Sequence, residues 1–263
     1  MVDWDEHAQR NRAAWNEIAA IRSSNIDSTG PDAEFFAAGG VNLPEPAVQA
    51  VGDLHGRSLL HLQCASGEES LSWAVLGAKV TGVDIADRLI DIARRKAEAA
   101  GLAVRFVAAD VGRLPADLGS GRFDVTYTGG GVLPWIPDIE IWARNVAGSL
   151  RPAGTFVLYE AHPVTACLEG TDSGITVAGD YFGRNARPET DTGWRHFPGG
   201  ETATSTKVQF VWPLGDVITA LITAGLVIER VSEYPGVPAW RFGDHQHEAE
   251  RLPGSFLLLA RKA

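Results

Sequence analysis

The sequence has little cysteine and no motif that pairs cysteines. Cys64 and Cys167 are the only two cysteines in 263 residues, and they lie far apart in the chain. This excludes the disulfide framework of a small secreted domain and the close cysteine spacing of a structural zinc site. We therefore expect two reduced thiols in a cytoplasmic protein. Because no paired carboxylates occur at ligand spacing, we also expect no bound metal.

Clusters of basic residues and long apolar runs are also lacking. Lys and Arg together number 23 against 33 Asp and Glu, which gives a formal net charge of −10. A surface of this sign repels phosphate backbones, and no run of basic residues overrides it. The apolar run at residues 256–260 is too short to cross a bilayer, and the acidic N-terminus does not resemble a signal peptide. The sequence predicts no nucleic-acid partner and no membrane association.

The sequence does contain a regular alternation of short apolar strands and amphipathic helices. The expected strands cover residues 58–62, 79–84, 104–108, 123–128 and 155–159. The expected helices cover residues 7–21, 68–76, 87–100, 139–150 and 215–224. Strands that alternate with helices in this way indicate an α/β fold with a doubly wound, parallel sheet and helices on both faces.

The last strands and one long interruption complete the predicted domain. Residues 226–231 and 255–259 form two strands with no helical pattern between them, which indicates an antiparallel hairpin at the sheet edge. Residues 151–154 read as a turn before the fifth strand. We expect a single domain over residues 1–263, with an N-terminal helical cap at 1–50 and an inserted lid at 162–211.

Polar residues follow the strands at the points where ligands bind in such a sheet, beyond the carboxyl ends. Asp84 and Asp110 come directly after the second and third strands, and the turn at 63–67 follows the first. Asp84 can accept hydrogen bonds from ribose hydroxyls, or it can cap the helix that begins near Asp87. Asp110 can accept from an adenine amino group with Val111 packed on the ring, or it can close a turn. Together the three strand ends predict one adenosine-sized ligand.

Five segments carry these features in a fixed order and spacing: Leu60–Gly67, Val80–Asp84, Phe106–Val111, Phe123–Val125 and Leu150–Gly154. They resemble class I S-adenosylmethionine-dependent methyltransferases, most closely the bacterial small-molecule branch. The resemblance implies a Rossmann-like, seven-stranded, mostly parallel sheet with an antiparallel last strand.

The same resemblance implies S-adenosyl-L-methionine as the cofactor. Its methionine part would lie at the first turn, its ribose at the second strand end, its adenine at the third and its sulfonium near the fourth. The predicted cofactor-binding residues are His61, Gln63, Cys64, Ala65, Gly67, Asp84, Ile85, Asp110, Val111, Thr128 and Gly129.

The first loop departs from the usual pattern of that family. His61 stands where the family has an acid, and Gln63 and Ala65 stand where it has glycines, so that only Gly67 remains. Gln63 can donate to the methionine carboxylate, and His61 can hold a water or the cofactor's amino group, or serve as a structural histidine. The loop also lacks the G-x-G-x-x-G pattern, and Glu68 would repel a pyrophosphate, which argues against a dinucleotide cofactor.

The acceptor side is marked by a histidine and by aromatic residues outside the core segments. His162 follows the fifth strand, and a histidine with a pKa near neutrality suits a general base. The alternative is a structural histidine that holds the inserted segment. Aromatic faces can line a small-molecule pocket, although core packing is the alternative for each one. The predicted substrate-binding residues are Trp15, Trp135, Tyr181, Trp194 and His196.

These expectations combine into one predicted function and two alternatives. The predicted function is transfer of the S-adenosylmethionine methyl group to an oxygen or nitrogen of a small organic molecule, such as a secondary metabolite, by a monomer or homodimer. The first alternative is a protein of the same fold that binds the cofactor without methyl transfer, as a scaffold, a pericyclase-like protein or a sensor. The second is a nicotinamide oxidoreductase, which would bind a dinucleotide.

Overall fold

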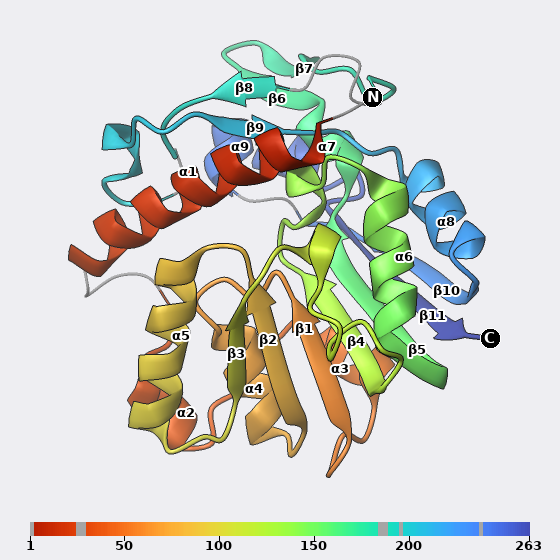
Figure 1. Cartoon of the computed structure of the whole chain (residues 1–263). Helices are drawn as coiled ribbons and strands as arrows, with labels where there is room; N and C mark the ends of the chain where they lie inside the picture. The colour runs from red at the N-terminus through yellow and green to blue at the C-terminus, as the bar shows by residue number, and fades with distance from the viewer. Residues whose placement is uncertain (1–2, 25–29, 184–188, 195–196, 237–238) are drawn as a thin grey trace.

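The computed structural model describes residues 3–24, 30–183, 189–194, 197–236 and 239–263. Its centre is a seven-stranded sheet in the order β10-β11-β5-β4-β1-β2-β3 (Figure 1). The strands are β1 (Ser58–Leu62), β2 (Lys79–Asp84), β3 (Arg105–Ala108), β4 (Phe123–Gly129), β5 (Leu150–Ala161), β10 (Leu226–Tyr234) and β11 (Ser255–Lys262). The strands β1 to β5 pair in parallel, and β11 runs antiparallel to both β5 and β10. The predicted fold class is therefore confirmed.

Helices cover both faces of the sheet. They are α2 (Ala33–Ala37), α3 (Glu45–Val51), α4 (Glu68–Val75), α5 (Asp87–Ala100), α6 (Ile139–Ser149) and α8 (Leu214–Thr223). On one face α6 and α8 pack around the fully buried Trp142, and on the other α3 and α4 pack around Trp73. Successive side chains of a strand point to opposite faces, so Leu60 enters the first cluster and its neighbour Leu59 enters the second.

One expectation about the later strands is modified and another was wrong. The predicted turn at 151–154 lies within the bounds of β5, at a break in its register: Phe123 pairs with Leu150 and Val125 with Thr155, and Ala153 has a φ of 58°. The segment between β10 and β11, expected to have no helix, contains α9 (Ala239–Phe242) and α10 (Gln246–Ala249). Helices of four residues are too short to produce a periodic pattern, and Phe242 and Ala249 are instead buried against Leu168 of the inserted segment.

A long helix and the inserted segment lie over the carboxyl ends of the strands. The helix is α1 (Trp4–Ser24), which crosses the top of the sheet in Figure 1. The inserted segment folds as α7 (Pro163–Ala166) and two hairpins, β6 (Leu168–Thr171) with β7 (Gly174–Val177) and β8 (Glu189–Asp191) with β9 (Lys207–Gln209). By contrast α2 and α3, which belong to the predicted cap at 1–50, pack on a face of the sheet.

Buried polar contacts tie α1 to the inserted segment. The Asn11 side chain, only 3% exposed, donates to the Val208 carbonyl at 2.9 Å and accepts from the Val208 N–H at 2.7 Å. Glu17 accepts from the backbone N–H groups of Thr204 and Ser205, and these hydrogen bonds lower its pKa to about 2. These contacts join α1 to β9 and to residues 204–205. We call this layer, which lies over the carboxyl ends of the strands, the roof.

The variant Asn11→Ala should lower the free energy of unfolding by about 1–3 kcal/mol, because it leaves the buried N–H and C=O of Val208 without partners. Urea unfolding followed by tryptophan fluorescence measures this loss. The matched control is Gln9→Ala on the exposed side of the same helix, which should change stability by less than about 0.5 kcal/mol. Equal losses in both variants would contradict this account of the roof.

Candidate functional site

A cavity lies between α1 and the carboxyl ends of β1 to β4. The empty space between these elements is about 1020 Å³, open solvent at its mouth included. Of the predicted cofactor residues, those that line it are His61, Gln63, Cys64, Ala65, Asp84, Ile85, Asp110, Val111 and Gly129. Gly67 and Thr128 do not line it. The ends of four neighbouring strands thus share one cavity, as the sequence predicts.

The loop after β1 has backbone conformations that glycine favours, although Gln63 and Ala65 carry side chains. Gln63 and Ala65 have φ angles of 57° and 46°, in the left-handed region that costs a residue with a Cβ about 1–2 kcal/mol. The Gln63 amide donates to the Val132 carbonyl at 3.1 Å and so links this loop to the one after β4. Gly67 serves packing, because a Cβ there would lie 2.8 Å from the Ala93 Cβ on α5.

Asp84 fastens the β1 loop to the end of β2. Its Oδ2 accepts from the Ala65 N–H and its Oδ1 from the Ala86 N–H, both at 2.9 Å. The carboxyl is 9% exposed, and burial raises its pKa to about 6 despite these hydrogen bonds. The N-cap position of α5 belongs to Ala86, so Asp84 is not the helix cap. Each of its oxygens keeps a lone pair that can face the cavity.

Asp110 at the end of β3 receives an unexpected partner from the N-terminus. Its Oδ2 accepts from the Trp4 indole N–H at 2.7 Å, and its Oδ1 accepts from the Gly112 N–H at 2.8 Å. The Trp4 ring lies flush against Gly112, where a Cβ would come within 2.1 Å of it. Trp4 therefore covers the third strand end and lines the cavity beside Val111. Sequence reasoning missed it, because the pattern of the first helix gives no hint of a contact more than a hundred residues away.

A set of buried polar groups forms the part of the cavity wall nearest β1, β4 and β5. The His61 Nδ1 lies 2.8 Å from the Ser70 Oγ, and its Nε2 lies 3.7 Å from the Glu69 Oε2. Burial lowers the pKa of His61 to about 3. Burial also raises the pKa of Glu69 to about 7, and the negative charges of Glu68 and Glu160 add to that rise. The wall thus holds a neutral imidazole beside a carboxyl that titrates near neutrality.

Glu160 shapes the loop after β4. This fully buried carboxyl accepts from the backbone N–H groups of Gly131, Val132 and Leu133, at 2.8, 2.5 and 3.2 Å. Gly130 and Gly131 have φ angles of 78° and 91°, which glycine adopts without steric cost. The loop therefore has a fixed shape along the cavity wall.

The structure places His162 away from the cavity. Its Nδ1 accepts from the Val164 N–H, which caps α7, and its Nε2 lies 3.0 Å from the Glu233 Oε1 on β10. Both ring nitrogens are therefore engaged in contacts that hold the inserted segment against the sheet edge. This geometry favours the structural alternative for His162 over the general base.

The predicted aromatic residues divide into two groups. Trp15 and Trp135 line the cavity with ring centroids 5.2 Å apart. Trp194 is 2% exposed and packs behind Trp15 at 4.5 Å, so it supports the wall without reaching the cavity. Tyr181 also lies elsewhere, where its hydroxyl accepts from the Leu214 N–H at 3.1 Å. His196 lies outside the described residues.

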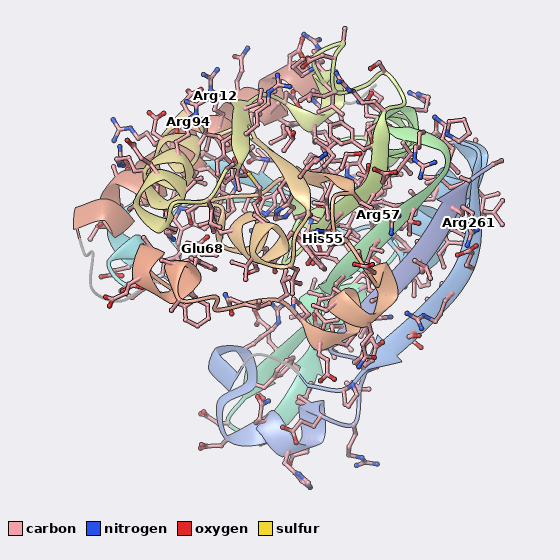
Figure 2. All side chains as sticks on the ribbon, turned by 90° about the horizontal axis from the view of Figure 1, so that it is seen from below. Arg12, His55, Arg57, Glu68, Arg94 and Arg261 are labelled. Atoms are coloured by element: carbon pink, nitrogen blue, oxygen red, sulfur yellow. The ribbon has the colours of Figure 1, made fainter. Side chains whose placement is uncertain are left out.

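Charged side chains near the site either close its rim or lie on the outer surface. Arg12 on α1 pairs with Asp87 on α5 at 2.5 Å, and Glu68 at the cavity pairs with Lys96 and Ser66. Figure 2 shows Arg12 on the side of the molecule where α5 lies and Arg261 at the far edge of the sheet. Among the described residues, no three His, Cys, Asp or Glu side chains are arranged to hold a metal ion, and no helix could span a membrane.

Residues 59–154 match the family model of the methyltransferase domain. The ubiquinone biosynthesis O-methyltransferase of Xanthomonas euvesicatoria is 32% identical over 143 residues, 54% of this chain and 58% of that protein. The enzyme of the same name from Bordetella pertussis is 35% identical over 106 residues, 40% of this chain and 43% of that protein. The chain therefore spans about half the length of these curated relatives.

Solved structures agree in fold over a larger part of the chain. An S-adenosylmethionine-dependent methyltransferase from Mesorhizobium loti has a TM-score of 0.61 at 24% identity, covering 82% of this chain and 96% of that one. Magnesium protoporphyrin IX methyltransferase from Synechocystis, solved with bound SAH, has a TM-score of 0.58 at 16% identity and covers 98% and 100%. Residues 59–154 are thus similar to the methyltransferase domain, and the fold of the whole chain is similar to that of solved S-adenosylmethionine-dependent methyltransferases.

Proposed function

We propose that this protein transfers the methyl group of S-adenosylmethionine to a hydroxyl oxygen of a small organic molecule. The observation that carries the proposal is the convergence of Gln63, Asp84, Asp110 and Gly129, from four strand ends, on one cavity within a methyltransferase domain. In such a transfer the enzyme contributes mainly by holding the acceptor oxygen in line with the methyl group in a site cleared of water.

The cavity has polar groups where the cofactor's own polar groups would lie. Asp84 would accept from the ribose hydroxyls through its free lone pairs, and Asp110 would accept from the adenine amino group beside Val111. The buried Nε2 of His61 and Oε1 of Gln63 have no hydrogen-bond partner among the described residues. Buried polar atoms without partners are costly. The Gln63 oxygen can accept a hydrogen bond from the ammonium group of a bound amino acid, directly or through water.

The acceptor would occupy the part of the cavity between α1 and the loop after β4. Trp15 and Trp135 give this part an aromatic wall, and Gly129 to Gly131 let a ligand come close to the backbone. The choice of oxygen over nitrogen is supported by the O-methyltransferase names of the curated relatives. An aromatic wall suits an aromatic ligand, so the proposed acceptor is a small aromatic molecule with a hydroxyl group, such as a catechol.

The variant Asp84→Ala should weaken binding of S-adenosylhomocysteine roughly 10- to 100-fold, because it removes charge-assisted acceptors for the ribose and frees two loop N–H groups. Isothermal titration calorimetry measures the dissociation constant. The control is Asp91→Ala, which removes an exposed carboxylate of α5 that pairs with Arg94 on the same helix. An unchanged dissociation constant in Asp84→Ala would contradict the ribose assignment.

Transfer itself is tested with S-adenosylmethionine labelled on its methyl group and a panel of catechols, phenols and aromatic amines. We expect label on a hydroxyl oxygen of at least one catechol or phenol, located by mass spectrometry of the product. Binding of S-adenosylhomocysteine without transfer to any panel member would favour a cofactor-binding protein over an enzyme. Label found only on amine nitrogen would overturn the choice of oxygen.

A further inference from the structure

One carboxylate of the cavity wall, that of Glu69, differs from the others because its neighbouring donors are a hydroxyl, that of Tyr127, and a neutral imidazole, that of His61. Asp84 and Asp110 each accept backbone N–H groups, and Glu68 pairs with Lys96. Glu69 also lines the cavity, with its side chain 24% exposed, yet within the described part of the chain it accepts no backbone N–H and faces no lysine or arginine. A carboxylate in this position is available to a ligand.

We propose that Glu69 is the catalytic base that takes the proton from the acceptor's hydroxyl, and that the neutral imidazole of His61 positions it. This inference rests on the proposed function. The acceptor's O–H bond breaks as the proton moves to a Glu69 oxygen. The acceptor oxygen then forms a bond to the methyl carbon, and the electrons of the carbon–sulfur bond remain on sulfur. The proton leaves to solvent through the partly exposed side of Glu69.

The neighbours of Glu69 come from four elements and suit this role. On α4 itself Glu68 contributes a negative charge, although Lys96 partly offsets it. On β1 the His61 ring is uncharged, and on β4 the Tyr127 hydroxyl lies beside the carboxyl. On β5 the buried Glu160 contributes a second negative charge. Burial and the charges of Glu68 and Glu160 raise the pKa of Glu69 to about 7. This value suits a base that works at neutral pH.

The contact with Ser70 orients the His61 ring so that its Nε2 faces Glu69. If the Ser70 hydroxyl donates to Nδ1 at 2.8 Å, the ring proton is on Nε2, which faces the Glu69 Oε2 at 3.7 Å. A movement of less than an ångström would turn this contact into a hydrogen bond.

The first test compares Glu69→Gln with the wild type, using the catechol or phenol that the wild type methylates best. We expect kcat to fall roughly 100-fold or more, with the dissociation constant of S-adenosylhomocysteine changed by less than about threefold. In the wild type kcat should rise with pH and level off above about 7, and the variant should lose this rise. The matched control is Glu233→Gln, which removes the exposed partner of His162 and should leave kcat and its pH profile unchanged.

Other outcomes separate the failure of this inference from the failure of the proposed function. An unchanged kcat in Glu69→Gln would overturn the inference alone. Cofactor binding weakened more than tenfold at constant kcat would show that Glu69 binds the cofactor's ammonium instead, and a loss of the pH profile in Glu233→Gln would return the role to His162. A wild type that methylates no catechol or phenol would overturn the proposed acceptor class and this inference with it.

A further test of Glu69 measures the stability of the protein and requires no acceptor molecule. Burial raises the pKa of Glu69 from 4.5 in the unfolded chain to about 7, so the folded state holds the proton more tightly than the unfolded state does. The wild type therefore loses stability as pH rises between these values, and Glu69→Gln is spared that part of the loss. The melting temperature of the variant relative to the wild type should be higher at pH 8 than at pH 5, as measured by differential scanning calorimetry. A difference that does not vary with pH would show that Glu69 is ionised throughout, and would contradict its role as a base that titrates near neutrality.

Discussion

The parallel register of β1 with its two neighbours is the constraint on which the site depends. Pairing places His61 opposite Gly82 on β2 and opposite Tyr127 on β4. Because the carboxyl ends of parallel strands lie at the same edge, strand pairing alone places Asp84, Asp110 and Gly129 at that edge. A shift of one residue would turn every side chain of a strand to the opposite face, and it would separate the imidazole from the carboxyl it faces. The geometry of the cavity is therefore a consequence of strand pairing.

Much of the fold and part of the site could be predicted from the sequence because they depend on local patterns. The strands and the helices between them are visible as apolar runs and as helical periodicity, and the strand ends identify Asp84 and Asp110. The contacts of Trp4 and His162 could not be predicted, because each depends on a distant segment. Trp4 meets Asp110 only after α1 folds over the sheet, and His162 meets Glu233 only when β10 lies nearby.

The part of the chain that is similar to known methyltransferases is not the part that covers the cavity. The family model covers residues 59–154, which include the strand ends that would hold the cofactor. The helix α1 and the inserted hairpins lie outside that range, and they contribute Trp15 and the layer behind it. Under the proposed function, residues 59–154 would bind the cofactor, while α1 and the inserted hairpins would supply the surface that selects the acceptor.

The helix α1 is a single rod of 21 residues, about 30 Å long at 1.5 Å per residue. Near one end it is fastened to the tip of β3 through Trp4, and farther along it is fastened to β9 through Asn11 and to the following residues of the insertion through Glu17. A rigid helix fastened at several points moves as one body. Under the proposed function, release of the demethylated cofactor at the Trp4 end and release of the product beneath the hairpins would therefore be coupled.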